Sequence, residues 1–365
     1  MHKREVKIWD TDLYTFLIYR TGLIILCVFF TASFNILPQK LYPVKIDGKY
    51  GFINSSGELV VQPEYIEFHH FSEGFVIVRK INNSGLFTTV DYGYLSADGI
   101  FRSEDNYRKL GYYNEGLAKV YKRGIGLFTK SKWGYIDTSG VLVIPNKFYN
   151  AGDFSERLAW VEKKDMFLFF VLSDTYGYIN HKGSIVIPYQ FDGAGNFCEG
   201  LANITLDDKR GFINKIGEIV IEPQFENVRE FSNGRAAVML NRKWGFIDRK
   251  GSFIVPAKYD EVRTFSDSLA AVSVSGKWGF INTSGELIIE PVFEDISGYN
   301  KGLCAVKINN KWGYINKAGS FVIKPKFEFA SIFSEGIAQV RINSKLCYIN
   351  LSGNIIWSSY ELLNN

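Results

Sequence analysis

The sequence predicts an all-β protein built from tandem three-stranded antiparallel meanders. Aromatic residues make up 16% of the 365 residues, and 34 glycines stand against 3 methionines, which favours short strands and tight turns over helices. A pattern of aromatic, Gly, aromatic, Ile and Asn or Asp recurs nine times along the chain. A second glycine follows each central position of this pattern after six residues.

The first 40 residues differ in composition from the rest. Basic residues at Lys3, Arg4 and Lys7 precede an uncharged apolar stretch over 21–37. This stretch is at the lower limit for a membrane-spanning helix and also suits the apolar region of a signal peptide. We therefore expect residues 1–40 to form an N-terminal apolar helix that acts as a signal or as a membrane anchor. The preceding positive charges place residues 41–365 outside the cytoplasm, in the cell envelope.

The repeats begin after this segment and continue to about residue 357. Their central positions are separated by 42, 41 and 43 residues and then by 34 residues five times, which indicates a repeat architecture. The central positions are Gly51, Gly93, Gly134, Gly177, Gly211, Gly245, Gly279, Gly313 and Cys347.

Each repeat predicts three strands. An apolar stretch such as 269–274 comes first, and a tight turn joins it to the strand that contains the central glycine. Asn or Asp followed by Gly then predicts a hairpin loop in which the glycine adopts a positive φ. The third strand ends in a proline and an aromatic residue, and the proline, which cannot donate a ladder hydrogen bond, marks the end of the strand or an edge strand.

The repeats are connected through Phe-Ser-Glu-Gly or a close variant, as in residues 71–74 and 333–336. The acidic position is Asn233 in one repeat and Lys301 in another, so its charge is not constant. We interpret the phenylalanine as a core residue and the Ser-Glu pair as turn chemistry.

These features resemble the WG-repeat (KWG-repeat) family of bacterial proteins. The similarity consists of the Lys-Trp-Gly-Phe-Ile-Asp/Asn core, the following Gly, the Val-Ile-x-Pro stretch and the Phe-Ser-Glu-Gly-Leu-Ala-x-Val tail, and it covers about residues 41–357. The resemblance implies a β-rich array, often behind a signal sequence, and it implies no catalytic residue. Arg210, Leu346 and Cys347 depart from the pattern.

The repeated aromatic residues have two interpretations. Burial between successive meanders is favoured, because one small sheet cannot cover its own apolar face, with glycine allowing a neighbouring backbone to approach. The alternative is an exposed aromatic row that stacks on sugars, as in a glycan or cell-wall binding protein. The residues assigned to the repeat core are Trp133, Trp244, Trp278, Trp312, Gly134, Gly245, Gly279 and Gly313.

The three longest repeats differ from the others between their first and second strands. The inserted residues are apolar at the tip with basic residues around them, and equivalent hairpins on adjacent repeats should project in one direction. Such a ridge predicts contact with a protein or a membrane surface. The predicted ridge consists of Leu86, Phe87, Leu127, Phe128, Phe167, Phe169, Lys163 and Lys164.

Several functions lack sequence support. The net charge of +4 gives no polybasic arm for nucleic acid. Walker, dinucleotide-binding, nucleophile-elbow and zinc-protease motifs are missing from the sequence, and the four histidines have no metal-ligand spacing, so we expect neither an enzyme nor a cofactor or metal site. Cys198, Cys304 and Cys347 occupy different repeat phases and predict no disulfide framework.

We therefore expect three segments: a signal or anchor over 1–40, nine repeats over 41–357 and a tail over 358–365. The predicted arrangement is an open superhelix of stacked meanders, with a closed propeller-like ring as the alternative. The predicted function is non-catalytic binding or scaffolding in the bacterial cell envelope, through a protein partner or the membrane surface, by a monomer.

Overall fold

The computed structural model describes residues 40–84, 87–122, 132–167 and 170–359, which belong to one compact unit. All regular structure in these ranges is β, as the sequence predicts, and they contain no helix that could cross a membrane. The helix expected within residues 1–40 lies outside the described residues, except for Lys40.

The strands form eight antiparallel sheets in which consecutive strands are neighbours. The first sheet contains β1 (Tyr42–Ile46), β2 (Lys49–Ile53), β3 (Leu59–Ser72), β4 (Phe75–Ser84), β5 (Phe87–Ser96) and β6 (Phe101–Ser103). The second contains β7 (Lys109–Asn114), β8 (Leu117–Lys122), β9 (Lys132–Asp137) and β10 (Leu142–Phe148). The third contains β11 (Asn150–Ala151), β12 (Leu158–Phe167), β13 (Phe170–Asn180) and β14 (Ile185–Phe191). The fourth contains β15 (Gly193–Cys198), β16 (Leu201–Leu206), β17 (Lys209–Asn214) and β18 (Ile219–Phe225).

The remaining sheets repeat this four-stranded plan. The fifth contains β19 (Asn227–Val228), β20 (Ala236–Leu240), β21 (Lys243–Ile247) and β22 (Phe253–Tyr259). The sixth contains β23 (Glu261–Val262), β24 (Leu269–Val274), β25 (Lys277–Asn282) and β26 (Leu287–Phe293). The seventh contains β27 (Asp295–Asn300), β28 (Leu303–Ile308), β29 (Lys311–Ile315) and β30 (Phe321–Phe327). The eighth contains β31 (Phe329–Ala330), β32 (Ile337–Ile342), β33 (Lys345–Asn350) and β34 (Ile355–Ser358).

Each repeat thus has one strand more than the predicted meander. The segment before Phe-Ser-Glu-Gly pairs as a short first strand, which has only two residues in β19, β23 and β31. Such short strands leave no alternation that a sequence pattern could reveal. Nine repeats occupy eight sheets because β3 is 14 residues long and runs from the first repeat into the second.

The central glycine of each repeat makes room for a strand of its own sheet. A Cβ on Gly279 would lie 2.4 Å from the carbonyl oxygen of Ile289 in β26, where the β25–β26 register shifts. The predicted close approach of a neighbouring backbone is therefore confirmed, and this backbone is the adjacent strand of the same sheet. The bulge before the proline in the third strand brings the backbone inward within the same sheet.

The hydrophobic core lies between successive repeats. Phe280 is 1% exposed and packs against Tyr299 of the next sheet, with ring centroids 4.9 Å apart. The aromatic residue after the central position is buried in all nine repeats, at positions 52, 94, 135, 178, 212, 246, 280, 314 and 348. Neighbouring sheets therefore share their core, as repeat architectures require.

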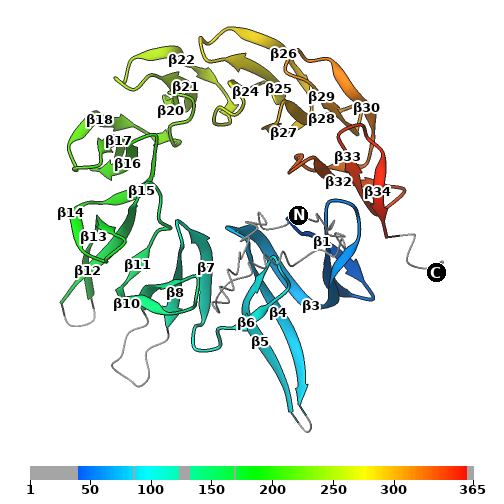
Figure 1. Ribbon diagram of the computed structural model, residues 1–365. Coiled ribbons are helices and arrows are strands. Elements are labelled where there is room, and N and C mark those ends of the chain that lie inside the picture. Colours follow the sequence, from blue (N-terminus) through cyan, green and yellow to red (C-terminus); the bar gives the residue numbers. More distant parts are fainter. Residues whose placement is uncertain (1–39, 85–86, 123–131, 168–169, 360–365) are drawn as a thin grey trace, which may run out of the picture. The chain divides into compact units, whose positions relative to one another are not determined.

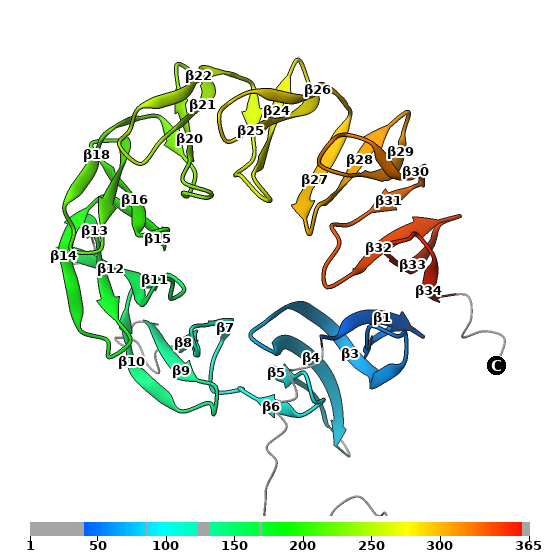
Figure 2. The ribbon, with the colours of Figure 1, turned by 45° about the horizontal axis from the view of Figure 1, so that its top comes forward.

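The predicted open superhelix is wrong, and the alternative ring is the observed arrangement: the sheets form a β-propeller (Figures 1 and 2). The first and last repeats share one core cluster, which consists of Tyr42, Val44, Ile53, Ile337, Tyr348 and Trp357. Strands of the first and last repeats belong to separate sheets, so no strand is exchanged between them. Closure instead uses side-chain packing, which needs no exchanged strand.

A tyrosine hydrogen bond marks the same interface in the repeats that carry tyrosine after the central position. Tyr135 and Tyr178 donate their hydroxyls to the carbonyls of Gly152 and Gly195, each 17 residues further on, at 2.6 and 2.9 Å. The last repeat has no residue at that distance in the described chain, and Tyr348 donates to the carbonyl of Pro43 at 2.6 Å. The first repeat therefore occupies the position that a tenth repeat would have beside the ninth.

The Ser-Glu turns link neighbouring repeats in addition to turning the chain. Ser155 donates its hydroxyl to the carbonyl of Phe197 at 2.6 Å, and the Glu156 carboxylate accepts the Gly200 N–H at 2.9 Å. Burial raises the pKa of Glu156, but hydrogen bonds from Lys215 and the Gly200 N–H outweigh burial and hold this pKa below its usual value. Turn chemistry was predicted for these residues, and the contact to the next repeat was not.

Candidate functional site

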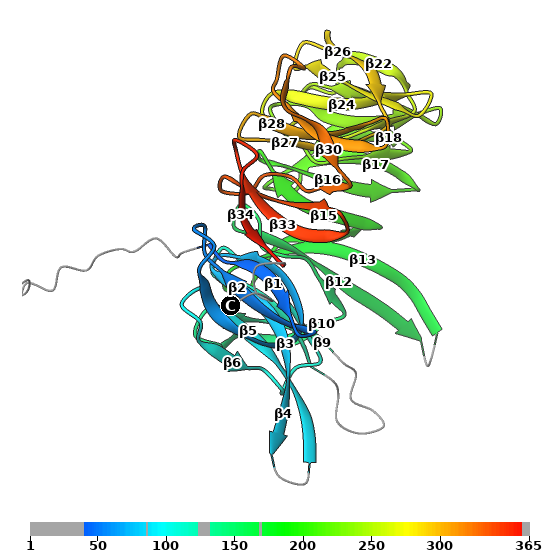
Figure 3. The same cartoon turned by 90° about the vertical axis from the view of Figure 1, so that its right-hand side faces the viewer.

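Two hairpins project beyond their sheets (Figure 3). Strands β4 and β5 have 10 residues each, and β12 and β13 have 10 and 11, whereas β16 and β17 have 6 each. The third expected extension, between β8 and β9, falls on residues 123–131, outside the described part of the chain.

The predicted ridge is only partly described. Leu86, Leu127, Phe128 and Phe169 lie outside the described residues. Phe87 begins β5, and Phe167 ends β12. Lys163 is exposed on β12, whereas Lys164 is half-buried and forms ion pairs with Glu162 at 2.9 Å and Asp174 at 3.1 Å.

The four tryptophans assigned to the repeat core do not form a row of open rings. Trp244 is 6% exposed, and Trp133, Trp278 and Trp312 are half-buried. Cationic groups lie over three of the rings: Lys119 over Trp133, Arg229 over Trp244 and Arg263 over Trp278, at 5.8, 5.1 and 5.4 Å from the centroids. The paired glycines are buried at Gly134, Gly245, Gly279 and Gly313.

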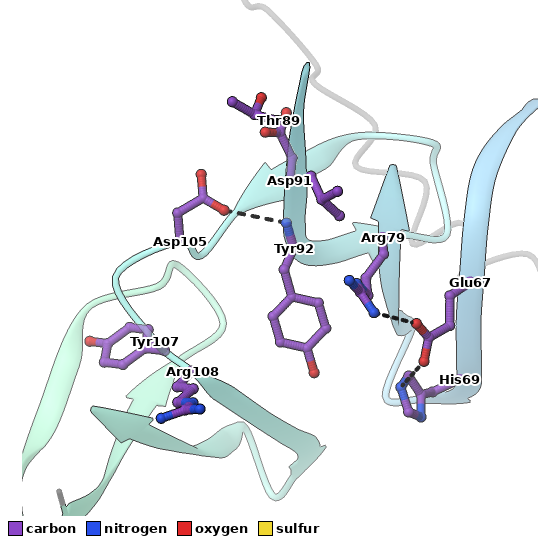
Figure 4. A pocket seen from close by; sticks show the side chains of 10 residues that line it. Glu67, His69, Arg79, Thr89, Asp91, Tyr92, Asp105, Tyr107 and Arg108 are labelled. Atoms are coloured by element: carbon purple, nitrogen blue, oxygen red, sulfur yellow. Dashed lines mark hydrogen bonds and ion pairs between the residues drawn. The ribbon is translucent and has the colours of Figure 1, made fainter. Parts of the chain in front are cut away.

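A cavity of about 760 Å³ lies at the base of the β4–β5 hairpin. Figure 4 shows Tyr92 between two groups of polar side chains. One group comes from β3 and β4, and the other comes from the connection between β6 and β7. The lining residues are Glu67, His69, Arg79, Thr89, Val90, Asp91, Tyr92, Asp105, Tyr107 and Arg108.

The charged groups of the cavity are only partly paired. Arg79 donates to Glu67 at 2.8 Å, and His69 lies 3.8 Å from the second oxygen of Glu67. Asp105 accepts the backbone N–H of Tyr92 at 3.3 Å. Arg108 is exposed, and no ion pair holds its guanidinium within the described ranges. The cavity therefore offers an available positive charge beside aromatic walls.

Burial changes the pKa of the two tyrosines that line the cavity, Tyr92 and Tyr107. It raises the pKa of Tyr92 above its usual value, and it raises the pKa of Tyr107 in the same direction. Both phenols therefore stay neutral and act as hydrogen-bonding, apolar surfaces at physiological pH. Tyr92 also shares one face of the hairpin with Arg79, its cross-strand partner.

Beyond the cavity, the hairpin exposes an apolar pair. Ile81 and Val90 face each other across β4 and β5, and they are 45% and 44% exposed. The β12–β13 hairpin has a charged pair, Lys164 and Asp174, across its strands instead. The two hairpins therefore differ in surface chemistry although both are extended.

The described residues contain no group of three or more His, Cys, Asp or Glu side chains that could hold a metal ion. A second cavity, of about 530 Å³, lies where the first and last repeats meet and is lined in part by Lys40, Tyr42, Glu73 and Glu335. Cys198 is half-buried and Cys304 and Cys347 are buried, and all three are free thiols.

Sequence reasoning found the extended hairpin but not the cavity at its base. Its lining comes from three strands and a connection, without a common spacing. The spacing gave no signal, because Gly99 and Tyr113 are as far apart as Gly285 and Tyr299 in a shorter repeat. The available signal was Asp105, which stands where the other repeat has Pro291.

The family model described as "WG containing repeat" matches seven segments, which together cover more than half of the chain: residues 50–83, 133–167, 176–209, 211–244, 244–278, 278–312 and 312–345. Residues 84–132, which contain β5 and one wall of the cavity, lie outside these matches. No curated protein matches the chain.

Solved structures with a similar fold are distant in sequence. The crystal structure of Citrobacter koseri AztD is 13% identical, with a TM-score of 0.40 over 75% of this chain and 90% of that one. The AfRom2 CNH domain is 12% identical, with a TM-score of 0.33 over 67% and 91%. A protein of unknown function from Bacteroides caccae is 14% identical, with a TM-score of 0.23 over 50% and 89%. At these values the similarities do not bear on function.

Proposed function

The chain belongs to the WG-repeat family, and from this premise we propose that it is a non-catalytic propeller that binds a partner protein in the cell envelope. The β4–β5 hairpin is the binding element. The observation that supports this proposal is an exposed apolar pair, Ile81 and Val90, directly above a polar cavity with an available arginine.

The chemistry of the hairpin favours a protein partner over a membrane surface. Binding surfaces combine apolar contact area with a few polar groups that fix orientation. Glu67, Asp91 and Asp105 line the cavity, and carboxylates at this position would repel anionic lipid headgroups. A folded partner or an extended segment can satisfy both the carboxylates and the arginines.

The non-catalytic part of the proposal rests on the pairing within the cavity. Arg79 and Glu67 neutralise each other, and Asp105 is engaged by a backbone N–H. These contacts orient side chains for recognition rather than activate a nucleophile. The location rests on the basic and apolar character of residues 1–40.

The proposal predicts that shortening the first hairpin removes partner capture. One variant deletes residues 81–90 and joins Lys80 to Asp91 through Asn-Gly, a turn that suits a two-residue hairpin. The matched control deletes residues 164–174 and joins Lys163 to Thr175, the equivalent cross-strand pair, in the same way. Each chain is immobilised and exposed to envelope extract, and the captured proteins are quantified by mass spectrometry.

We expect the first variant to lose enrichment of defined partner proteins by about tenfold or more, because it removes the centre of the contact surface. The control should capture them as the wild type does. Equal capture by the first variant would contradict the proposal. Binding to anionic phospholipid vesicles that depends on the first hairpin, without protein capture, would also contradict it and favour a membrane contact.

A further inference from the structure

The outer edge of β5 is open beyond Tyr92. Strand β6 pairs with β5 only from Gly93 to Leu95. The last backbone contact on this side is the Glu104 N–H donating to the Tyr92 carbonyl at 2.8 Å, while the Tyr92 N–H is taken by the Asp105 side chain. No other strand in the described ranges pairs with β5 on this side.

The alternation of an antiparallel strand shows which groups this edge offers. Both backbone polar groups of one residue point to the same side, and successive residues alternate. Tyr92 points both groups away from β4, toward Asp105 and Glu104. Val90, two residues earlier, therefore points its N–H and its carbonyl away from β4 as well, into the open edge.

This edge has few of the features that normally protect an exposed strand, and the one charged side chain in residues 88–92, Asp91, accepts a hydrogen bond from Asn82. Natural edges use lysine, proline, bulges or inward charges to prevent pairing with another chain. Residues 88–90 read Thr-Thr-Val, which are all β-branched residues with high strand propensity. The β13 edge before Tyr176 also has no neighbouring strand in the described ranges, but it carries the Lys164–Asp174 ion pair where the first hairpin has the apolar Ile81 and Val90.

The wall beside this edge carries the available positive charge. The Arg108 N–H donates to the Tyr121 carbonyl at 2.8 Å, which fixes the backbone of Arg108 on the second sheet. Its guanidinium lines the same cavity as Val90 and Tyr92 (Figure 4). A strand added to β5 at Val90 would therefore enter the cavity that Arg108 lines.

We propose that an extended peptide segment of the partner adds to β5 as a further strand beside residues 89–91, with an acidic side chain paired to Arg108. The inference rests on the proposed function and names the chemistry of its partner. Main-chain hydrogen bonds to Val90 supply affinity, and Arg108 supplies side-chain preference. The apolar side chains of Ile81 and Val90 lie on the adjoining face.

The test uses a fluorescein-labelled heptapeptide, acetyl-Thr-Val-Thr-Glu-Thr-Val-Thr-amide, and fluorescence anisotropy with the full chain. Val90→Pro removes the N–H at the open edge of β5. Ile81→Pro is the matched control, because Ile81 faces Val90 and points its N–H to the opposite edge of the same hairpin. Arg108→Gln and a Gln-for-Glu peptide test the charge pair in a double-mutant cycle.

We expect Val90→Pro to weaken peptide binding by about tenfold and Ile81→Pro to change it by less than about twofold, since only one edge is used. Arg108→Gln should weaken binding of the Glu peptide by about fivefold and leave the Gln peptide unchanged. A peptide with N-methyl groups at alternate backbone nitrogens should fail to bind.

Equal binding to Val90→Pro and the wild type would overturn the inference. Equal weakening by both proline variants would also overturn it, because it would show dependence on the hairpin and not on this edge. If the peptide does not bind to the wild type while the shortened hairpin still abolishes protein capture, strand addition is wrong and the proposed binding function stands.

Discussion

Replacing Gly279 with alanine is expected to lower the free energy of unfolding by about 3 kcal/mol, at the upper end for an overpacked core. The added Cβ would meet the Ile289 carbonyl oxygen at 2.4 Å and the Pro291 nitrogen at 2.7 Å. Both are backbone atoms, so no side-chain rotation can relieve the contact. Chemical unfolding followed by circular dichroism measures the change.

Gly276→Ala is the control for this prediction. Gly276 has a φ of +75°, and among the described atoms none lies within 4 Å of the Cβ position. Alanine at position 276 should lower the free energy of unfolding by only about 1 kcal/mol, because the left-handed backbone conformation is the one unfavourable factor. If the two variants lose equal stability, the close approach of β26 does not explain why the repeat contains this glycine.

Replacing Tyr348 with alanine is expected to cost about 3 kcal/mol or more, because the ring closes on this side chain. Tyr348 is 3% exposed, packs against Tyr42 with ring centroids 5.9 Å apart and donates to the Pro43 carbonyl. In an open array the same face of the last repeat would meet solvent, and its truncation would cost little.

Tyr178→Ala gives the reference for an interior interface, since Tyr178 is fully buried and makes the equivalent hydrogen bond to Gly195. We expect the two alanine variants to lose similar stability. Tyr348→Phe removes the hydroxyl but keeps the ring, and it should lower the free energy of unfolding by about 1 kcal/mol. A Tyr348→Ala variant as stable as the wild type would show that the first and last repeats are apart.

The repeat, its turns and its core were predictable because they depend on contacts within a repeat and with the next one. Asn282 accepts the N–H groups of Ser284 and Glu286, and Gly285 has a φ of +84°, as the loop chemistry predicts. Closure was not predictable in this way. It depends on Pro43 and Tyr348, which are 305 residues apart and belong to no shared pattern.

The candidate site likewise has one part that the sequence predicts and one part that it does not. The length of the β4–β5 hairpin follows from the spacing between central glycines, so the extension was visible in the sequence. The cavity was not, because it depends on where β6 stops. Strand β6 has three residues, whereas β10 and β14 have seven each, and the connection that follows β6 supplies Asp105, Tyr107 and Arg108 to the cavity.

The closed ring is the central claim, because it places the first sheet and its hairpin between two neighbours. Zero-length carbodiimide crosslinking of the dilute full chain, followed by peptide mass spectrometry, tests it directly. Lys301 lies 2.7 Å from Glu335, so a Lys301–Glu335 crosslink is the internal control between consecutive repeats. Lys40 donates to Ser334 at 2.5 Å and lines the same cavity as Glu335. A closed ring predicts a Lys40–Glu335 crosslink in the monomer, and its absence beside a strong Lys301–Glu335 crosslink would contradict the account.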